Sequence, residues 1–392
     1  MATFITSKQV GTQIINAHVE TSTGFWKYNH DGVDSSAFPN GWENLPITNA
    51  NGEFTIISCD VDGLLIGDIT LLELNNNQLT SFDGTGLSSL TSLNLSSSQL
   101  ASFDGTGLSS LTSLNLSNSS NIASFDGTGL SSLVTLALAG NQLTSLDGYI
   151  FPSSLTTLSL NNNNLASFDG TGLSSLVYLN LGNNQLTSFD GTDLSSLTEL
   201  QLNDNQLTSV DVTGLSNLDT LWLWNNQLTS VDVTGLSSLR LADLSGNQLT
   251  SFDGTGLSSL TSLSLSQNQL TSFNGTDLSS LVILGLTDNQ LASFDGTGLS
   301  SLTTLLLNGN QLTPSANNQI LHQLSQNGVM AFGGKGDPIG DFRSNNGRTA
   351  ASNADYDNLF NNLGWRFQGL DLVTPPPTGN GKLRVKGVTT GI

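Results

Sequence analysis

The sequence has few basic residues, one cysteine and no long apolar segment. Its 10 Lys and Arg residues stand against 31 Asp and Glu residues, and the net charge of −21 would repel nucleic acids and anionic membrane surfaces. We therefore expect neither as a partner. Cys59 has no second cysteine with which to form an intrachain disulfide. Residues 1–20 lack the segments of a secretory signal, and no stretch approaches the ~18 apolar residues of a membrane span, so we expect no membrane insertion.

The side chains that carry most enzyme chemistry are also scarce or scattered. The three histidines lie far apart, and neither a nucleophile elbow nor a phosphate-binding glycine loop is present. His18, His30 and Cys59 do not have the spacing of a metal site. We therefore expect no catalytic residue, no metal, no cofactor and no enzymatic activity.

What the chain does have is a repeated unit of 21 residues, such as residues 90–110, LTSLNLSSSQLASFDGTGLSS. The unit recurs from about residue 69 to about residue 312, and two of its copies have 22 residues instead of 21. Its apolar residues follow L-x-x-L-x-L-x-x-N-x-L, which at a period of 20 to 29 residues is the signature of leucine-rich repeats. The first apolar residue of each unit, which we call the anchor, falls at Ile69, Leu90, Leu111, Leu133, Leu155, Leu176, Leu197, Leu218, Leu239, Leu260, Leu281 and Leu302.

This pattern predicts a leucine-rich repeat solenoid with a curved parallel sheet over residues 69–313. Within each unit x-L-x-L-x forms a short strand whose leucines both point inward, because side chains alternate along a strand. One unit cannot bury its leucines alone, so about 12 stacked units must share a core. We expect the two 22-residue units to bulge away from the sheet near residues 118–121 and 149–154.

The two ends of the chain depart from the repeat and are expected to be attachment points. Residues 1–68 have the alternation and turn residues of a β-rich N-terminal cap, which also covers the open end of the first repeat. Residues 374–392 join a stiff triple-proline linker to a basic, strand-like tail around Lys382, Arg384 and Lys386. We expect both ends to contact other subunits of an assembly.

The segment between the repeats and the tail predicts a second cap. Residues 314–373 are expected to form an α+β unit that covers the last repeat. Its elements are a helix over residues 317–325, a second helix over 353–363 and a strand over 365–372.

Two further columns, with one residue from each unit, predict structural ladders. An asparagine after the strand can bond the backbone of the turn, and a phenylalanine on the return side can stack as a second spine behind the sheet. The asparagines are Asn77, Asn141, Asn163, Asn184, Asn205, Asn226, Asn247, Asn268, Asn289 and Asn310. The phenylalanines are Phe82, Phe103, Phe125, Phe168, Phe189, Phe252, Phe273 and Phe294, with Leu146, Val210 and Val231 in the same position.

A third column holds an aspartate in each turn and raises the possibility of a calcium ladder. Neighbouring carboxylates about 5 Å apart in water repel by only about 0.8 kcal/mol. A backbone N–H donated to a charged acceptor contributes roughly 1.5 to 3 kcal/mol, so turn capping can hold the column without a cation. We expect capping rather than metal binding, as the neutral Asn274 in this column also indicates. The other members are Asp83, Asp104, Asp126, Asp147, Asp169, Asp190, Asp211, Asp232, Asp253 and Asp295.

The face that differs between repeats is the concave one. The second, fourth and sixth residues after each anchor point outward there and are mostly small and polar, as in Ser92, Asn94 and Ser96. The middle repeats instead carry aromatic, carboxylate and amide side chains, a mixture suited to ligand recognition. We expect a ligand-binding patch, which we call the concave patch, of Tyr178, Glu199, Gln201, Asp204, Trp222, Trp224 and Asp243. Contact with a neighbouring subunit and random variation between repeat copies are the alternatives.

The repeats resemble those of bacterial and bacteriophage leucine-rich repeat proteins, with SVDVTGLSNL at residue 209 closest to bacterial surface adhesins. The flanking TSTGFWKYNHDGVDSS and LFNNLGWRF are similar to segments of tail-fibre-like virion proteins of tailed, particularly marine, phages. The resemblance implies a protein on the exterior of a virion that binds a host-surface glycan or protein. A cellular adhesin or scaffold at the cell surface, binding a protein partner, and a structural virion decoration protein are the alternatives.

Overall fold

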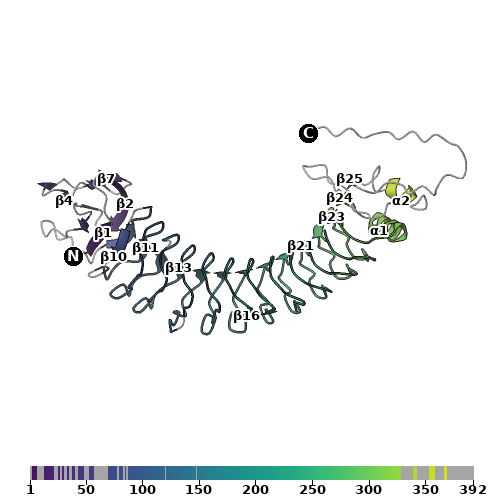
Figure 1. Cartoon of the computed structure of the whole chain (residues 1–392), viewed down its shortest axis with the longest axis horizontal. Coiled ribbons are helices and arrows are strands. Elements are labelled where there is room, and N and C mark those ends of the chain that lie inside the picture. The colour runs from purple at the N-terminus through teal and green to yellow at the C-terminus, as the bar shows by residue number, and fades with distance from the viewer. Residues whose placement is uncertain are drawn as a thin grey trace, which may run out of the picture.

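The computed structural model describes residues 87–327 with gaps only at residues 120 and 147. Before residue 87 it describes ten strands and a few residues beside them, and after residue 327 it describes three short segments. The repeats form an arc, with strands along its concave side and turns along its convex side (Figure 1). The predicted parallel solenoid is confirmed.

One long sheet lines the concave side. Each repeat contributes a strand that pairs in parallel with the strands of its two neighbours, and equivalent residues lie opposite each other, as Ser92 lies opposite Ser113. The repeat strands are β9 (Ile69–Glu73), β11 (Ser92–Asn94), β12 (Ser113–Asn115), β13 (Thr135–Ala137), β14 (Thr157–Ser159), β15 (Tyr178–Asn180), β17 (Glu199–Gln201), β19 (Thr220–Trp222), β20 (Leu241–Asp243), β21 (Ser262–Ser264), β22 (Ile283–Gly285) and β23 (Thr304–Leu306). These twelve strands match the twelve anchors.

Antiparallel strands from the N-terminal segment continue this sheet at its first edge. Strand β2 (Gln13–Thr21) pairs with β9, and β7 (Glu43–Ile47) pairs with β2. A separate sheet joins β1 (Ala2–Thr6) to β8 (Glu53–Ile56) and to β10 (Leu79–Phe82). The edge of β9 is therefore paired rather than bare. The remaining short strands form two pairs, β3 (Phe25–Trp26) with β6 (Phe38–Pro39) and β4 (Asn29–His30) with β5 (Val33–Asp34).

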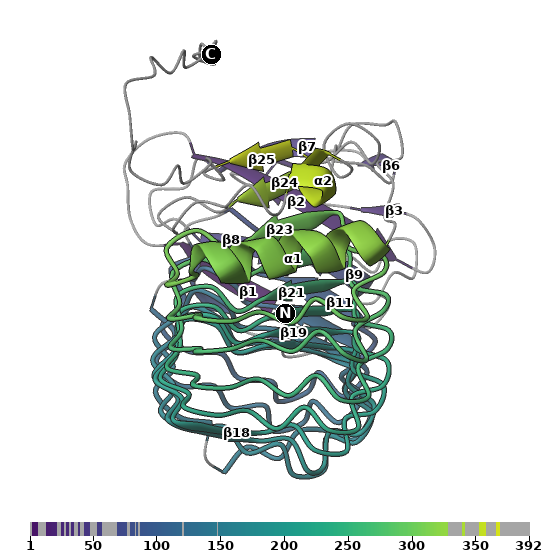
Figure 2. The ribbon, with the colours of Figure 1, turned by 90° about the vertical axis from the view of Figure 1, so that its right-hand side faces the viewer.

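A helix lies at the other end of the repeats (Figure 2). Helix α1 (Pro314–Asn327) buries Ile320, Leu321 and Leu324. It begins three residues before the predicted helix, because proline suits the first helical position and the Thr313 hydroxyl accepts a hydrogen bond from the Ala316 N–H at 3.2 Å.

Two strands beyond α1 extend the parallel sheet. Strand β24 (Ile339–Asp341), which was not predicted, pairs with β23, and β25 (Arg366–Gln368) pairs with β24. Helix α2 (Asn353–Asp357) occupies the start of the second predicted helix. The rest of that helix, most of the predicted last strand and the basic tail lie outside the described residues, and the predicted domain boundaries stay predictions. Within the part of the chain that the structure describes, neither helix has the length and hydropathy to cross a membrane.

The asparagine ladder crosses the core between successive turns. The Asn205 side-chain nitrogen donates to the carbonyls of Leu181 at 3.0 Å and Leu202 at 3.1 Å. Its side-chain oxygen accepts from the Leu186 N–H at 3.0 Å. The predicted bond to the backbone of the turn is confirmed, since Asn205 also donates to the Asn203 carbonyl at 3.2 Å. Because Leu181 and Leu186 belong to the preceding repeat, the asparagine joins two repeats as well, which the sequence analysis did not predict. Asn77 lies outside the described residues.

The aromatic spine runs behind the sheet but is interrupted. Phe82, Phe103 and Phe125 stack at centroid separations of 6.0 and 6.2 Å. In the repeat of β18 (Ser209–Asp211), which pairs with β16 (Ser188–Asp190) on the convex side, Val210 is only half-buried and Val212 is the buried residue. Val210 packs against the core in the predicted position, as the half-buried Phe168 and Phe252 do, and Val212 adds a second apolar side chain that the sequence analysis did not name.

Candidate functional site

The strands β15, β17, β19 and β20 bring most of the concave patch together. Tyr178 lies directly opposite Glu199, and Gln201 lies opposite Trp222, which in turn lies opposite Asp243 on its other side. Directly opposed residues on neighbouring strands have their Cβ atoms about 5 Å apart. The alternation of the strand, with a buried leucine between two half-buried residues, directs these side chains to the concave face.

The polar members of the patch already hold one another in place. The Gln201 side-chain nitrogen donates to a Glu199 carboxylate oxygen at 2.6 Å. Asp243 accepts from both the backbone N–H, at 3.0 Å, and the hydroxyl, at 2.6 Å, of Ser245. One carboxylate oxygen of each acid therefore has a partner within the protein, and the other is available to a ligand.

The two tryptophans have the exposure of the face on which they lie. Both Trp222 and Trp224 are half-buried, and the Trp222 indole nitrogen is buried without a hydrogen-bond partner among the described residues. The outward residues of the neighbouring strands, such as Tyr178 and Gln201, are half-buried as well. Each ring still offers part of its surface to a ligand.

Asp204 belongs to the edge of the patch rather than to a strand. Its backbone has a φ of 52°, in the left-handed region that the turn after each strand requires. Its carboxylate accepts hydrogen bonds at 3.0 Å from the side-chain amides of Asn203 and Asn225. Asp204 therefore continues the polar surface from β17 toward the turn of the next repeat.

Apolar and charged residues flank the patch. Leu241, which the sequence also places on this face, is half-buried on β20, and Ile283, two strands further along the same row and outside the patch, is 45% exposed. Arg240 pairs with Asp219, and this guanidinium and, to a smaller extent, Thr220 lower the pKa of Asp219, although burial raises it. Sequence reasoning did not single out Ile283, although an isoleucine stands there where most repeats have serine or threonine.

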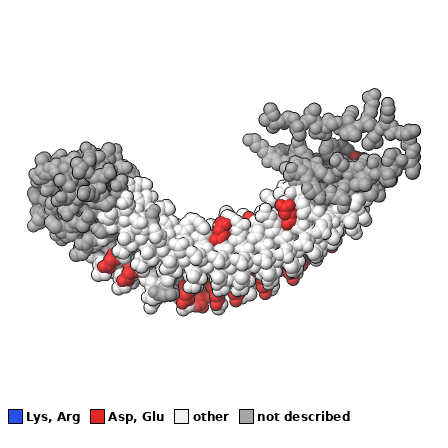
Figure 3. All heavy atoms as spheres, viewed as in Figure 1, with Lys and Arg blue, Asp and Glu red and all other residues white. Residues whose placement is uncertain are grey.

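The aspartate column lies along the turns, and acidic residues form a row on the convex side of the arc (Figure 3). Asp126 accepts from the Thr128 N–H at 2.9 Å and from the Thr128 hydroxyl at 2.6 Å. Both hydrogen bonds lower the pKa of the Asp126 carboxyl, and the bond from the hydroxyl has the larger effect. Asp169, Asp190 and Asp253 make the same pair of bonds with the threonine two residues later.

These bonds confirm the capping role that the sequence predicted for the described members of the column. Asn274 accepts the same backbone bond from the Thr276 N–H at 2.9 Å without carrying a charge. Among the described residues, no group of three histidine, cysteine or acidic side chains is placed to hold a metal ion. That the column needs no metal stays a prediction, tested below.

Comparisons with known proteins agree with this geometry. The family model for leucine-rich repeats in two copies matches residues 153–196 and 195–238. A solved leucine-rich repeat protein of Leptospira interrogans is 32% identical over 65% of this chain and 70% of that chain, with a TM-score of 0.59. The chain belongs to the leucine-rich repeat proteins. Solenoids of this family typically serve as non-enzymatic binding scaffolds.

Two other solved leucine-rich repeat structures are similar. The functional domain of InlJ from Listeria monocytogenes is 25% identical, with a TM-score of 0.61 over 75% of this chain. This chain spans 63% of that domain's length. The leucine-rich repeat domain of APL1B, at 20% identity, shares the fold with a TM-score of 0.58 over 79% of this chain and 89% of that one. No curated protein matched the sequence.

Proposed function

We propose that this leucine-rich repeat chain is a recognition protein on the exterior of a phage virion, where its concave patch binds a host-surface glycan. The observation that carries the proposal is the placement of two indole rings beside carboxylates and amides on neighbouring concave strands. Elsewhere that face carries mostly short polar side chains, as Ser92 and Asn94 illustrate. A long concave face is the usual binding surface of a solenoid.

The chemistry of the patch suits a sugar. A sugar ring offers C–H groups to an indole face and hydroxyls to carboxylates and amides. Trp222 and Trp224 supply the apolar surface, and Glu199, Gln201 and Asp243 supply acceptors and a donor. The negative charge of the patch disfavours anionic polymers, so the ligand class is a neutral or cationic saccharide.

The ends of the chain are proposed to attach it to other virion subunits. The segments outside the repeats, residues 1–68 and 314–392, contain these ends and carry nine of the ten basic residues, since Arg240 is the single basic residue from position 69 to position 334. Segments that do not stack into the solenoid are available for other contacts. The flanking sequence motifs that resemble tail-fibre-like proteins lie in these same segments.

A second candidate is a cellular leucine-rich repeat protein that binds a protein partner. The similarity to bacterial proteins from Leptospira interrogans and Listeria monocytogenes favours it. Genes for capsid, portal or tail proteins beside this one would support the virion location, and their absence would support the cell surface.

The test of glycan binding is a screen of the purified protein against immobilised neutral, cationic and anionic saccharides from host envelopes. Wild type should bind a neutral or cationic class, and Trp222→Ala and Trp224→Ala should bind it weakly. Ile283→Ala removes an exposed apolar side chain on the same face and serves as the matched control. Equal binding by all four proteins, with folding intact, would move the recognition site elsewhere.

A further inference from the structure

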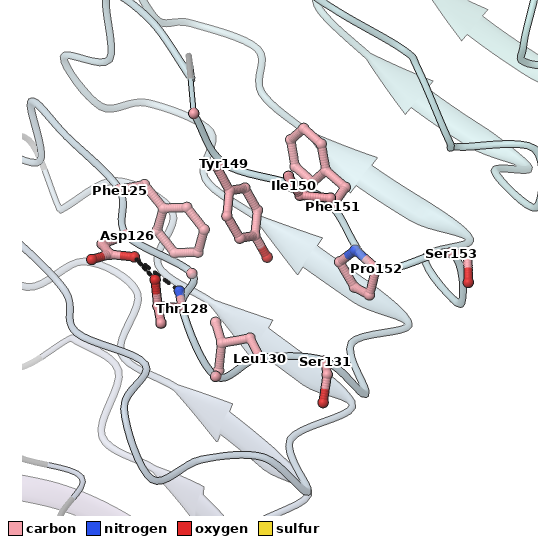
Figure 4. A pocket seen from close by; sticks show the side chains of 13 residues that line it. Phe125, Asp126, Thr128, Leu130, Ser131, Tyr149, Ile150, Phe151, Pro152 and Ser153 are labelled. Carbon is pink, nitrogen blue, oxygen red and sulfur yellow. Dashed lines mark hydrogen bonds between the residues drawn. The ribbon is translucent and has the colours of Figure 1, made fainter.

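A groove of about 720 Å³ lies away from the concave face, between the turns of two successive repeats. One wall is the turn at residues 125–131, and the other is residues 148–153 of the second 22-residue unit. Figure 4 shows the ring of Tyr149 standing beside that of Phe125, with Leu130 and Pro152 further along the same hollow.

The groove exists because this repeat has an altered turn. Where six other units read Asp-Gly-Thr-Gly-Leu, residues 147–151 read Asp-Gly-Tyr-Ile-Phe. The Tyr149 ring lies across Gly127, where an added Cβ would stand 2.1 Å from its Cε2 atom. It meets Phe125 edge-on at a centroid separation of 5.2 Å and meets Phe151 at 4.8 Å. Three rings therefore form an apolar base in place of the regular stack.

Two features of the altered turn make no favourable contribution to folding. The Tyr149 hydroxyl is buried without a hydrogen-bond partner among the described residues. Burial, and to a smaller extent Asp126, raises the pKa of Tyr149 to about 12, so the hydroxyl stays protonated at neutral pH. Ile150 is 88% exposed, about twice the exposed fraction of Ile283. Apolar side chains gathered at an exposed hollow are typical of a surface that binds a partner.

The charge around the groove limits what that partner can be. Asp126 lines the groove and is exposed. Arg240, the single basic residue from position 69 to position 334, is already paired with Asp219. The last 21 residues of the chain, in contrast, carry three basic and no acidic side chains. A segment that combines apolar side chains with cations fits the groove.

We propose that the groove binds the basic segment at residues 382–386 of a second copy of this chain. The segment reads Lys-Leu-Arg-Val-Lys, so that an extended backbone places Leu383 and Val385 on one side and three cations on the other. The apolar side meets Ile150 and the aromatic rings, and a cation pairs with the Asp126 carboxylate.

A chain's own tail has no length to spare for reaching its own groove. The 14 residues from Gln368, where β25 ends, to Lys382 span at most about 50 Å. The sheet order places ten to eleven strand spacings between β25 and the two repeats of the groove, which is about 48 to 53 Å along the concave side. The groove lies away from that side, so a fully extended tail would use its whole length before it passed around to the turns, and we assign the tail to another copy.

A tail bound in the groove of the next copy is a head-to-tail contact. Such contacts generate open chains or rings instead of stopping at a dimer with twofold symmetry. Self-association should therefore rise with protein concentration and weaken with salt, because part of the attraction is between exposed charges.

The binding test measures the fluorescence anisotropy of a labelled peptide, residues 378–392, against the full-length protein. Ile150→Ser should weaken binding about tenfold or more, and Asp126→Asn should weaken it less and reduce its salt dependence. Val177→Ser, at a residue 39% exposed elsewhere, is the matched control and should bind as wild type does. Circular dichroism checks folding. Absence of peptide binding, or equal affinity for Ile150→Ser, overturns the proposal.

Sedimentation velocity on the same full-length proteins tests the second copy. Wild type should assemble as its concentration rises, excess peptide should reverse this, and Ile150→Ser should stay monomeric. A wild-type monomer at every concentration overturns the proposal. Saccharide binding by Ile150→Ser should equal that of wild type, so a failure here is distinguishable from a failure of the concave patch.

Discussion

The side-chain oxygen of Asn163 accepts a hydrogen bond at 3.0 Å from the backbone N–H of Leu143, one repeat earlier in the chain. The Asn163 amide nitrogen donates to the carbonyls of Leu138 at 3.0 Å and Leu160 at 2.9 Å. A single buried side chain thus satisfies backbone groups of two repeats. The solenoid is held together by this ladder as well as by its leucines, and neighbouring repeats should unfold together.

Asn205→Ala should be strongly destabilising. It leaves the buried Leu186 N–H without its partner, at about 1 to 3 kcal/mol. It also removes one of the two asparagine amides from which the Leu181 and Leu202 carbonyls each accept a hydrogen bond. Guanidinium denaturation measures the change in free energy of unfolding. Gln206→Ala, at the exposed next position, is the control and should change it by less than about 0.5 kcal/mol.

Asn141→Ala should cost less than Asn205→Ala. The Asn141 side-chain oxygen has no partner among the described residues, so its removal leaves no backbone N–H without an acceptor. The variant loses only donor bonds, to the carbonyls of Leu116, Leu138 and Ala139. The same denaturation experiment compares the two variants, and a larger loss for Asn141→Ala would contradict this reading of the ladder.

Removing divalent metal should leave the thermal stability unchanged. The aspartates of the column already accept bonds from the threonine two residues later, as Asp190 does from the Thr192 N–H at 2.9 Å. A melting curve with and without EDTA measures this. A decrease in Tm of more than a few degrees would show that a calcium ladder replaces turn capping.

The capped turns should also give the protein an acid-sensitive stability. The threonine hydroxyls, and secondly their N–H groups, lower the pKa values of Asp169, Asp190 and Asp253 below the ordinary 3.8. This stability is present above the unfolded-state pKa and is lost as pH falls through the lower folded-state pKa. Replacing Thr171, Thr192 and Thr255 together by valine should therefore destabilise the protein near pH 7, and the difference from wild type should shrink between about pH 5 and pH 2. A difference independent of pH would contradict the prediction.

Gly127→Ala should destabilise the protein by about 1 to 3 kcal/mol, because its Cβ would overlap the Tyr149 ring. Gly170→Ala is the matched control, since the nearest atom to an added Cβ there is Leu194 Cδ2 at 3.2 Å, a contact that a small shift relieves. Thermal denaturation compares the loss of stability in the two variants. An equal loss would show that Tyr149 moves aside at little cost.

The sequence predicted the parts of the fold that depend on spacing. The position of Leu93 between two outward residues follows from the alternation of a strand. The ladder to which Asn205 belongs follows from the asparagine that recurs at the same position of successive repeats. The register of Gln201 beside Trp222 follows from the same period. A fixed repeat carries this information because each unit meets the same neighbours.

Features that depend on how large side chains pack at one particular place could not be predicted. The Trp222 indole nitrogen is buried without a partner, and the groove arises because Tyr149 crosses Gly127 of the preceding repeat. The bulge expected at residues 149–154 coincides with one wall of the groove. The spacing of the repeats does not show that this segment and the preceding turn enclose a hollow. The start of α1 at Pro314 was missed because the proline was taken as the end of the repeats rather than the first helical residue.

Calorimetric titration of the isolated protein with the saccharide found in the screen tests the concave patch most directly. We expect Trp222→Ala and Trp224→Ala each to lose about 2 kcal/mol of binding free energy, roughly thirtyfold in affinity, while Ile283→Ala binds as wild type does. Isolated protein is needed because many copies on one particle would mask the loss through avidity. Wild-type affinity in both tryptophan variants, with folding intact, would contradict recognition through this patch.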